Sequence, residues 1–280
     1  MCSSDLCPQN IIYLLTARTR YADDTALSMA SRTLVAMRLG GLWDHVEGGF
    51  HRYSTDDRWL LPHFEKMLYD QAMMLYAYTA GWAVTRDDLF RSTALDIANY
   101  IANHLTAPAG GFYCGEDADS DGEEGLFHTW SYDELTRALP PEDLVAAMEL
   151  FNMSPNGNFS DEASGRASGR NIPHLTRRPG DRASEASRLT GLLRLVRDRR
   201  PRPHRDEKVL ADWNGLASAA LAFAGRVLGA SMLVEQARCS TEFVLREMVR
   251  EDGRLLHRWA AGEASIPGFL DDYAFLGLAA

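Results

Sequence analysis

Four titratable side chains crowd the start of an apolar segment, "WLLPHFEKMLYDQ" at residues 59–71: His63, Glu65, Lys66 and Asp70. On a helix, His63, Lys66 and Asp70 fall at i, i+3 and i+7 and share one face, with Glu65 about 100° from Lys66. A histidine and carboxylates gathered in this way suit proton transfer at a sugar hydroxyl or carbonyl. The order H-F-E-K lacks the H-E-x-x-H spacing, which argues against a zinc-protease site. An ordinary helix start, with Glu65 favoured by the helix dipole, is the structural alternative.

A second acidic group lies in "EDADSDGEEG", residues 116–125. Glu116 and Asp117 directly follow a predicted strand, so we expect their carboxylates to point into the same cavity. The D-x-D-x-D-G order resembles a calcium loop, but the twelfth position is His128 and the flanks read as strands rather than helices. A plain solvated turn is the alternative to inward-facing carboxylates.

Paired carboxylates are the groups that carry out glycoside hydrolysis, and their separation decides between inversion and retention. The predicted catalytic residues are therefore His63, Glu65, Asp70, Glu116 and Asp117. Side chains that could hold a sugar by stacking or by polar contacts form a second set: Arg52, Tyr53, Lys66, Trp130, Asp212, Trp213, Asn214, Asp272 and Tyr273. Each tryptophan could equally be a core residue. We expect neither a metal nor a cofactor.

Apolar residues at helical spacing predict the elements that must position these groups. Helices are expected over about 23–39, 63–84, 87–105, 140–151, 207–228 and 233–249. Gly40 and Gly41 end the first helix, and Pro62 is well placed to begin the second. Ser131 with Glu134 forms a capping box that opens a further short helix. Short strands are expected at 111–114 and 126–130, around the acidic loop.

A Leu-x-Asp repeat runs through the chain, as Leu68/Asp70, Leu210/Asp212 and Leu270/Asp272. In the first two copies a lysine precedes the leucine by two positions, and both copies continue into a pair of helices and then a glycine-led strand. Repeated helix pairs with varied inserts are the sequence sign of a helical toroid or solenoid. The fold class is therefore all-α, an alpha/alpha toroid with short β-hairpins at its mouth, where polar groups at the repeat register would line one cavity.

Four blocks of the sequence resemble the spermatogenesis-associated protein 20 family, whose bacterial members are called thioredoxin-domain-containing proteins: "GGFHRYSTDDRWLLPHFEKMLYDQA", "GGFYCGEDADSDGEEGLFHTW", "RPRPHRDEKVLADWNGLASAALA" and "GFLDDYAFL". The resemblance covers about residues 25–280. It implies a six-hairpin alpha/alpha toroid, the fold shared by several glycoside hydrolases and by N-acylglucosamine 2-epimerase.

The chain departs from the family pattern in three ways. The N-terminal thioredoxin-like domain of the family is missing, and in the full-length protein that domain would be a partner. The chain stops within the helix that "GFLDDYA" begins, so we expect an incomplete ring that is inactive by itself. Asp212 stands where relatives usually carry a small or uncharged residue.

Composition and charge limit the partners, the cellular location and the domain organisation that the chain can have. A formal charge of -10 argues against nucleic-acid or anionic-membrane partners, and no apolar run approaches the roughly 20 residues that span a bilayer. The four cysteines have no metal-ligand spacing, which favours a cytoplasmic chain with free thiols. We expect residues 1–20 to be a non-native or poorly ordered leader and 21–280 to be the partial toroid. An Arg/Ser/Gly-rich insert at about 160–205 reads as a solvated linker, with RNA contact as the weaker alternative.

Two functions are compatible with these patterns. The first is a carbohydrate-type cavity with sugar hydrolase or epimerase/isomerase activity, in which a histidine and carboxylates act as acid and base. The alternative is a non-catalytic toroid that binds a ligand or a protein and works with the thioredoxin-like domain.

Overall fold

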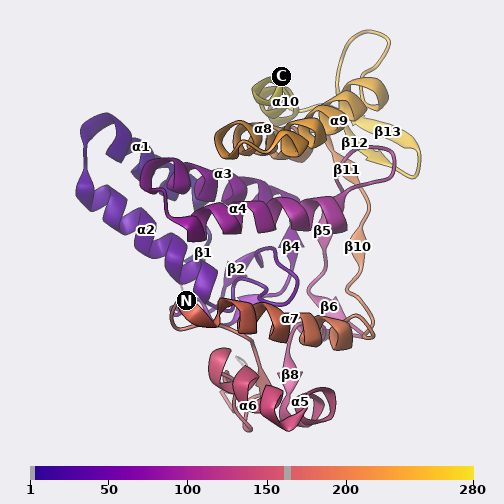
Figure 1. Ribbon diagram of the computed structural model, residues 1–280. Helices are drawn as coiled ribbons and strands as arrows, with labels where there is room; N and C mark the ends of the chain where they lie inside the picture. The colour runs from indigo at the N-terminus through magenta and orange to yellow at the C-terminus, as the bar shows by residue number, and fades with distance from the viewer. Residues whose placement is uncertain (1–3, 161–164) are drawn as a thin grey trace. The chain divides into compact units, whose positions relative to one another are not determined.

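The computed structural model describes residues 4–160 and 165–280 (Figure 1). The chain forms two compact units, each assembled from separate stretches of sequence. The first unit contains Met1–Leu6, Ala36–Glu65 and Asp117–His204. The second contains Cys7–Val35, Lys66–Glu116 and Arg205–Ala280. Helix α2 (Asp24–Leu39) continues from the second unit into the first.

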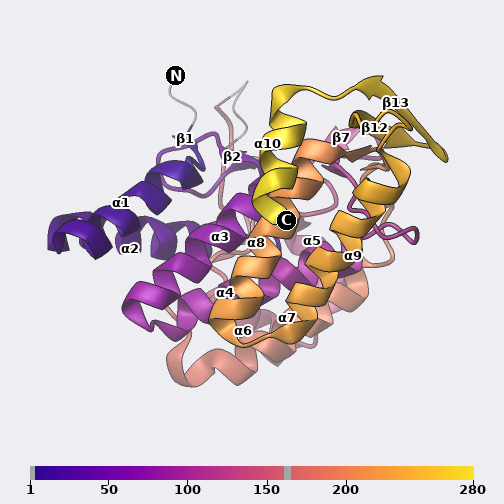
Figure 2. The ribbon, with the colours of Figure 1, turned by 90° about the horizontal axis from the view of Figure 1, so that it is seen from above.

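Helices of the second unit pack as consecutive pairs in a row (Figures 1 and 2). α3 (Leu68–Thr85) pairs with α4 (Asp88–Tyr100), which a π-helical turn η1 (Ile101–Leu105) extends, and α8 (Ala211–Leu228) pairs with α9 (Ser231–Glu247). α1 (Pro8–Tyr21) packs on α3, α3 on α8, and α8 on α10 (Leu270–Ala279). This row of helical hairpins confirms the predicted all-α class and has the arrangement of an alpha/alpha toroid.

Small and aromatic side chains let these helices approach closely. Tyr76 of α3 stacks on Phe223 of α8 with ring centroids 4.4 Å apart. Gly215 of α8 lies directly against the backbone of α10, where an added Cβ would sit 2.5 Å from the nitrogen of Leu276. The glycine of the "WNG" motif therefore serves the packing of α8 against α10.

Two three-stranded sheets accompany the helices of the second unit. One has the order β10 (Arg205–Asp206), β5 (Gly115–Glu116), β4 (Lys66–Met67), and the other β11 (Val209–Leu210), β12 (Leu256–Ala260), β13 (Glu263–Pro267). Neighbouring strands within both sheets are antiparallel. In two repeat units a short strand thus leads directly into a helix, β4 into α3 and β11 into α8.

This strand corrects one sequence-based prediction. The helix expected from His63 begins at Leu68, because Lys66 and Met67 pair with Glu116 and Gly115 in the β4–β5 ladder. His63 instead lies in β3 (Pro62–His63) of the first unit. The predicted shared helix face of His63, Lys66 and Asp70 is therefore wrong.

The first unit is built from short elements. Its strands form a sheet of order β1 (Ser4–Asp5), β2 (Tyr53–Ser54), β3. Two further antiparallel pairs are β6 (Asp119–Ser120) with β7 (Glu123–Glu124) and β8 (Trp130–Ser131) with β9 (Arg170–Asn171). Its helices are α5 (Tyr132–Ala138), α6 (Pro141–Leu150), the 3₁₀ turn η2 (Gly180–Arg182) and α7 (Ala183–Arg197). The Ser131/Glu134 capping box of α5 is confirmed. Strands were predicted at 111–114 and 126–130 but lie at 115–116, 119–120, 123–124 and 130–131.

The arginine-rich segment is not a solvated linker in its described part. α7 buries Leu189, Leu193 and Arg197. The Arg197 guanidinium lies 2.9 Å from Asp44 and 3.3 Å from Glu47, all three side chains being almost completely buried. Arg200 donates to the carbonyls of Phe127 and Thr129 at 2.8 Å. The basic residues that suggested a linker thus hold the first unit together, while residues 161–164 of the insert lie outside the described residues.

The start of the chain is also more regular than expected. Pro8–Tyr21 form α1, with Ile11 and Leu15 buried. The leader predicted for residues 1–20 therefore contains a packed helix from Pro8 onward, and residues 1–3 lie outside the described residues.

Candidate functional site

A cavity of about 450 Å³ opens in the first unit, and we call it the His63 cavity. Its wall combines aromatic, hydroxyl and charged side chains. It is lined by Tyr53, Thr55, Leu61, Pro62, His63, Phe64, Glu123, Glu124, Thr129, Phe159, Ser168 and Arg170. Of the residues predicted from sequence, Tyr53 and His63 contribute to this wall.

The imidazole of His63 lies between two carboxylates. Its Nδ1 is 2.7 Å from Oε1 of Glu124, and its Nε2 is 3.2 Å from Oε2 of Glu65. The ring stacks on Tyr53 with centroids 4.9 Å apart. Tyr53 and His63 are directly paired across β2 and β3, which accounts for the stacking. His63 is therefore held from three sides.

Glu65 is in turn held by Arg52. A guanidinium nitrogen of Arg52 donates to Oε2 of Glu65 at 2.7 Å, and the Arg52 backbone N–H donates to the Glu65 carbonyl at 2.9 Å. One carboxylate oxygen thus faces both the guanidinium and the imidazole. The predicted site residues Arg52, Glu65 and His63 are together in one chain of polar contacts.

Glu124 reaches His63 from a tight hairpin. Asp121 and Gly122 connect β6 to β7, and both have positive φ, 55° and 79°. An Asp-Gly pair with two positive φ values is the preferred two-residue hairpin turn, because its twist matches that of the strands. The segment that resembled a calcium loop is therefore a β-hairpin that carries Glu123 and Glu124 to the cavity.

The far wall is fixed by Arg170. Its Nε donates to the Thr129 hydroxyl at 2.6 Å and its Nη2 to the Thr129 carbonyl at 2.9 Å. Glu134 lies 3.6 Å from the same guanidinium. Arg170 therefore presents a positive charge at a defined position in an otherwise acidic and aromatic wall.

The two ring nitrogens of His63 each face one carboxylate. A neutral imidazole has one N–H, so it can donate to only one of two flanking carboxylates, whereas an imidazolium can donate to both. The imidazole ring also fills the space between the two carboxylates, so neither water nor a sugar ring can lie between them.

The predicted residues Lys66, Asp70 and Glu116 are buried in the second unit, and Lys66 and Glu116 lie side by side. Lys66 and Glu116 are directly opposite each other on β4 and β5, and both are buried. The Tyr100 hydroxyl donates to Glu116 at 2.5 Å, and the Lys66 ammonium lies 4.7 Å from the centre of the Tyr100 ring. Asp70 is buried in the first turn of α3. The neighbouring Asp117 belongs to the first unit and is exposed, with its carboxylate on the N–H of Ala118 at 2.7 Å.

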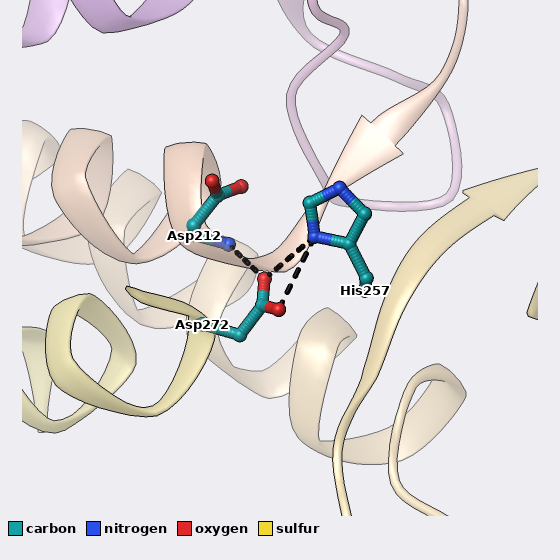
Figure 3. Close-up of side chains that lie close together, drawn as sticks. All are labelled: Asp212, His257 and Asp272. Carbon is teal, nitrogen blue, oxygen red and sulfur yellow. Dashed lines mark hydrogen bonds and ion pairs between the residues drawn. The ribbon is translucent and has the colours of Figure 1, made fainter. Parts of the chain in front are cut away.

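The other two Leu-x-Asp aspartates meet in the second unit, beside a histidine that was not predicted (Figure 3). Asp272 accepts from the Asp212 backbone N–H at 2.9 Å and lies 3.0 Å from Nδ1 of His257. Burial raises the pKa of the Asp212 carboxyl, and the charge of Asp272 raises it further. These residues come from α8, β12 and α10.

The other residues predicted to bind a sugar form contacts within the protein itself. Asn214 is buried, and its side-chain amide accepts from Phe112 N–H and the Ser240 hydroxyl while donating to the carbonyls of Phe112 and Leu210. Trp130 is fully buried. Trp213 packs edge-on against Tyr69, and the half-exposed Tyr273 accepts from the N–H of Leu255 at 3.0 Å.

Sequence reasoning missed Glu123, Glu124, Thr129 and Arg170 of the His63 cavity, and also His257. The Asp-Gly pair that forms the hairpin was visible at residues 121–122 and would have indicated that the two glutamates follow a tight turn. Nothing in the sequence pairs that hairpin with His63.

Similarity to known proteins agrees with the sequence blocks. The chain is 38% identical to mouse spermatogenesis-associated protein 20 over 302 residues and 37% identical to the human protein over 301 residues. The chain is related to the spermatogenesis-associated protein 20 family. Each alignment covers 94% of this chain and 38% of the relative, so the chain spans well under half the length of spermatogenesis-associated protein 20. The predicted resemblance is confirmed. No family model matches the chain.

Solved structures similar to this relative of spermatogenesis-associated protein 20 are more distant. A family 76 glycoside hydrolase (mannosidase) from Bacteroides thetaiotaomicron gives a TM-score of 0.49 at 10% identity, over 87% of this chain and 44% of that chain. A cellobiose 2-epimerase from Spirochaeta thermophila gives 0.40 at 13% identity, over 99% and 70% of the two chains. No helix in the described part of the chain is both long and apolar enough to cross a bilayer.

Proposed function

We propose that the His63 cavity binds a small, sugar-like ligand and that His63 transfers a proton on it. The observation that carries this proposal is the imidazole held between Glu65 and Glu124 at 3.2 and 2.7 Å. A positioned histidine with carboxylate partners is the commonest general acid or base in enzymes. The carboxylates would orient the ring and stabilise its charged form.

The wall of the cavity supports a polar ligand of modest size. Its volume of about 450 Å³ falls within the range of small-molecule sites. Tyr53 and Phe64 offer aromatic surface, while Glu123 and Arg170 offer charged hydrogen-bonding groups. A cavity wall that combines apolar surface with a few fixed polar atoms can hold and orient a polyhydroxylated molecule.

Within this proposal, epimerisation or isomerisation fits better than hydrolysis. A glycosidase needs its two carboxyl groups on either side of the scissile bond. Glu65 and Glu124 contact opposite nitrogens of one imidazole, so that ring occupies the space a scissile bond would need. Proton removal and return by His63, next to a ligand carbonyl, requires no such space.

A second candidate is ligand binding without turnover, in a toroid that works with a thioredoxin-like domain in the full-length protein. One observation favours it: both ring nitrogens of His63 already face carboxylates, so a ligand must displace one of them before His63 can act. Glu124 is the easier to displace, because 48% of its side chain is exposed against 25% for Glu65, which is also bound to Arg52.

A thermal-shift screen of monosaccharides, disaccharides and polyols on this chain would identify a ligand. We expect the shift to be lost in His63→Ala and kept in His204→Ala, which removes an exposed histidine of the same unit. In the full-length protein, proton transfer predicts incorporation of solvent deuterium into the ligand, and its loss in His63→Ala and Glu65→Gln. Binding without deuterium exchange would favour the second candidate, and unchanged turnover in both variants would reject the catalytic assignment.

A further inference from the structure

Asp212, His257 and Asp272 converge from three elements of the second unit (Figure 3). Asp212 lies in the first turn of α8, His257 in β12 and Asp272 in the first turn of α10. One potential ligand atom of each residue lies within 4.8 Å of the other two. The cluster thus combines two carboxylates and an imidazole, the two ligand types that divalent transition metals most often share.

Backbone hydrogen bonds fix the central carboxylate. Oδ1 of Asp272 accepts from the Asp212 N–H at 2.9 Å, and Oδ2 accepts from the Phe269 N–H at 2.7 Å. The Asp272 side chain is completely buried, and that of His257 is 21% exposed. A ligand set needs this kind of support, because outer hydrogen bonds hold ligating carboxylates in place.

The cluster carries an excess of negative charge. In the part of the chain that the structure describes, neither Asp212 nor Asp272 forms an ion pair with a lysine or arginine, and His257 is the cationic group within reach. With a neutral imidazole, two adjacent carboxylates in a largely buried position have no compensating charge. Like charges so placed destabilise the protein, and a bound cation would relieve the repulsion.

We propose that Asp212, His257 and Asp272 bind one divalent transition-metal ion of the zinc or manganese class. The ion replaces the proton that Nδ1 of His257 shares with Asp272, and this proton is released to solvent. Imidazole ligation selects against calcium and magnesium, which prefer all-oxygen sites. Three protein ligands leave at least one coordination position for water or another ligand.

The distances between His257 and Asp272 need little change, whereas the Asp212 carboxylate, which accepts from the Trp213 N–H at 2.8 Å, must leave that donor. Metal–ligand bonds of about 2.0–2.1 Å place neighbouring ligand atoms roughly 2.8–3.0 Å apart in octahedral geometry and roughly 3.3–3.4 Å apart in tetrahedral geometry. The His257 Nδ1 to Asp272 distances are 3.0 and 3.2 Å. The Asp212 carboxylate must approach by rotation of its side chain. Its backbone N–H can keep its bond to Asp272, since rotation about the side chain leaves the backbone in place.

This site is independent of the proposed function of the His63 cavity, which lies in the other unit. The test is titration of the chain with Mn²⁺, followed by the electron paramagnetic resonance of free Mn²⁺, and with Co²⁺, followed by visible absorption. We expect one equivalent of ion to bind, and Asp212→Asn and His257→Gln to weaken it at least tenfold. Asp271→Asn is the matched control, because Asp271 is an exposed aspartate in the same turn of α10.

Circular dichroism of each variant establishes that it is folded. Asp212→Asn keeps the backbone donor to Asp272, so loss of binding in a folded Asp212→Asn chain supports the site. Three results would overturn it: no binding by the native chain, binding that survives both variants, or a Co²⁺ spectrum with thiolate charge-transfer bands, which would assign the ion to cysteine. Equal affinity for Ca²⁺ would be a fourth contradicting result, because calcium prefers all-oxygen sites.

Discussion

His63 and Glu124 lie 61 residues apart in the sequence, and Nδ1 of the first is 2.7 Å from Oε1 of the second. The same Glu124 oxygen accepts from the Phe64 backbone N–H at 3.3 Å. A tight hairpin thus brings one carboxylate to both the imidazole and the strand that carries it. Orientation of His63 depends on this hairpin as much as on its own sequence neighbours.

Replacing Glu124 should therefore affect chemistry at His63 more than replacing its neighbour. We expect Glu124→Gln to slow ligand proton exchange by roughly 10- to 100-fold, because the charge that stabilises the imidazolium is lost. Glu123→Gln, in the same hairpin and also lining the cavity, should change the rate less than twofold. Deuterium incorporation followed by NMR measures both. Equal effects of the two variants would mean that the hairpin affects the exchange rate only through its net charge and not through the contact between Glu124 and His63.

A glycine beside the cavity offers a second prediction. Gly125 has φ of +71°, and an added Cβ would lie 2.5 Å from the Phe64 ring. Gly122 has φ of +79° with nothing within 4 Å of an added Cβ. Both alanine variants suffer the left-handed backbone cost of about 1–2 kcal/mol. Gly125→Ala should lose a further 1–3 kcal/mol, roughly, from displacement of Phe64, measured by urea unfolding. Equal losses would show that Phe64 moves freely.

The buried charges of the first unit should be needed for its stability. Arg197→Ala leaves Asp44 and Glu47 without their buried guanidinium partner, which typically costs about 3–5 kcal/mol. Arg199→Ala removes an exposed arginine two residues away and should cost less than about 0.5 kcal/mol. Denaturant unfolding of both variants gives the comparison. A small effect of Arg197→Ala would mean that other partners, such as Arg202 at 3.0 Å from Glu47, compensate the two carboxylates.

Stability should fall with acidification because of His45. Burial lowers its pKa from 6.5 to about 3, helped by the charge of Arg38, while its Nε2–H donates to the carbonyls of Leu39 and Gly40. Between these two pKa values the unfolded chain binds a proton that the folded chain does not. The stability present above pH 6.5 is therefore lost toward pH 3, by up to about 1.4 kcal/mol per pH unit.

His45→Gln keeps an N–H donor but cannot titrate, so its unfolding free energy should fall less steeply over this range. Unfolding curves collected between pH 7 and pH 4 measure the slope. Burial also lowers the pKa of His174, so part of the slope should remain in His45→Gln. An identical slope in the native chain and in His45→Gln would contradict the assignment.

The sequence predicted what depends on local spacing. The helical hairpins and the Ser131/Glu134 capping box followed from periodicity and capping chemistry, and the family followed from the four sequence blocks that resemble it. Helix α3 was placed five residues too early, since the pairing of Lys66 with Glu116 depends on a strand 50 residues away in the chain. Local patterns carry no information on such a partner.

The same reason limited the candidate site. His63, Glu65, Arg52 and Tyr53 are close in sequence, and the structure brings them together. Glu124 and Arg170 come from distant segments and were missed. Trp130 and Asn214, which were predicted to contact a sugar, are buried. A tryptophan ring packs in a core as readily as on a ligand, and an asparagine amide can form its hydrogen bonds within the protein.

The small sheet β10–β5–β4 has a consequence for the architecture of the chain. The chain passes between the two units at five points, and three of them, 65–66, 116–117 and 204–205, each adjoin one strand of this sheet. Glu116 is paired with Lys66 on one side and with Arg205 on the other. The segment 117–204 therefore begins and ends at two strands, β5 and β10, that are paired with each other. The entropic cost of closing such a loop grows only slowly with its length. Insertions, deletions or replacements within the segment 117–204 would therefore leave the packing of the helices in the second unit unchanged.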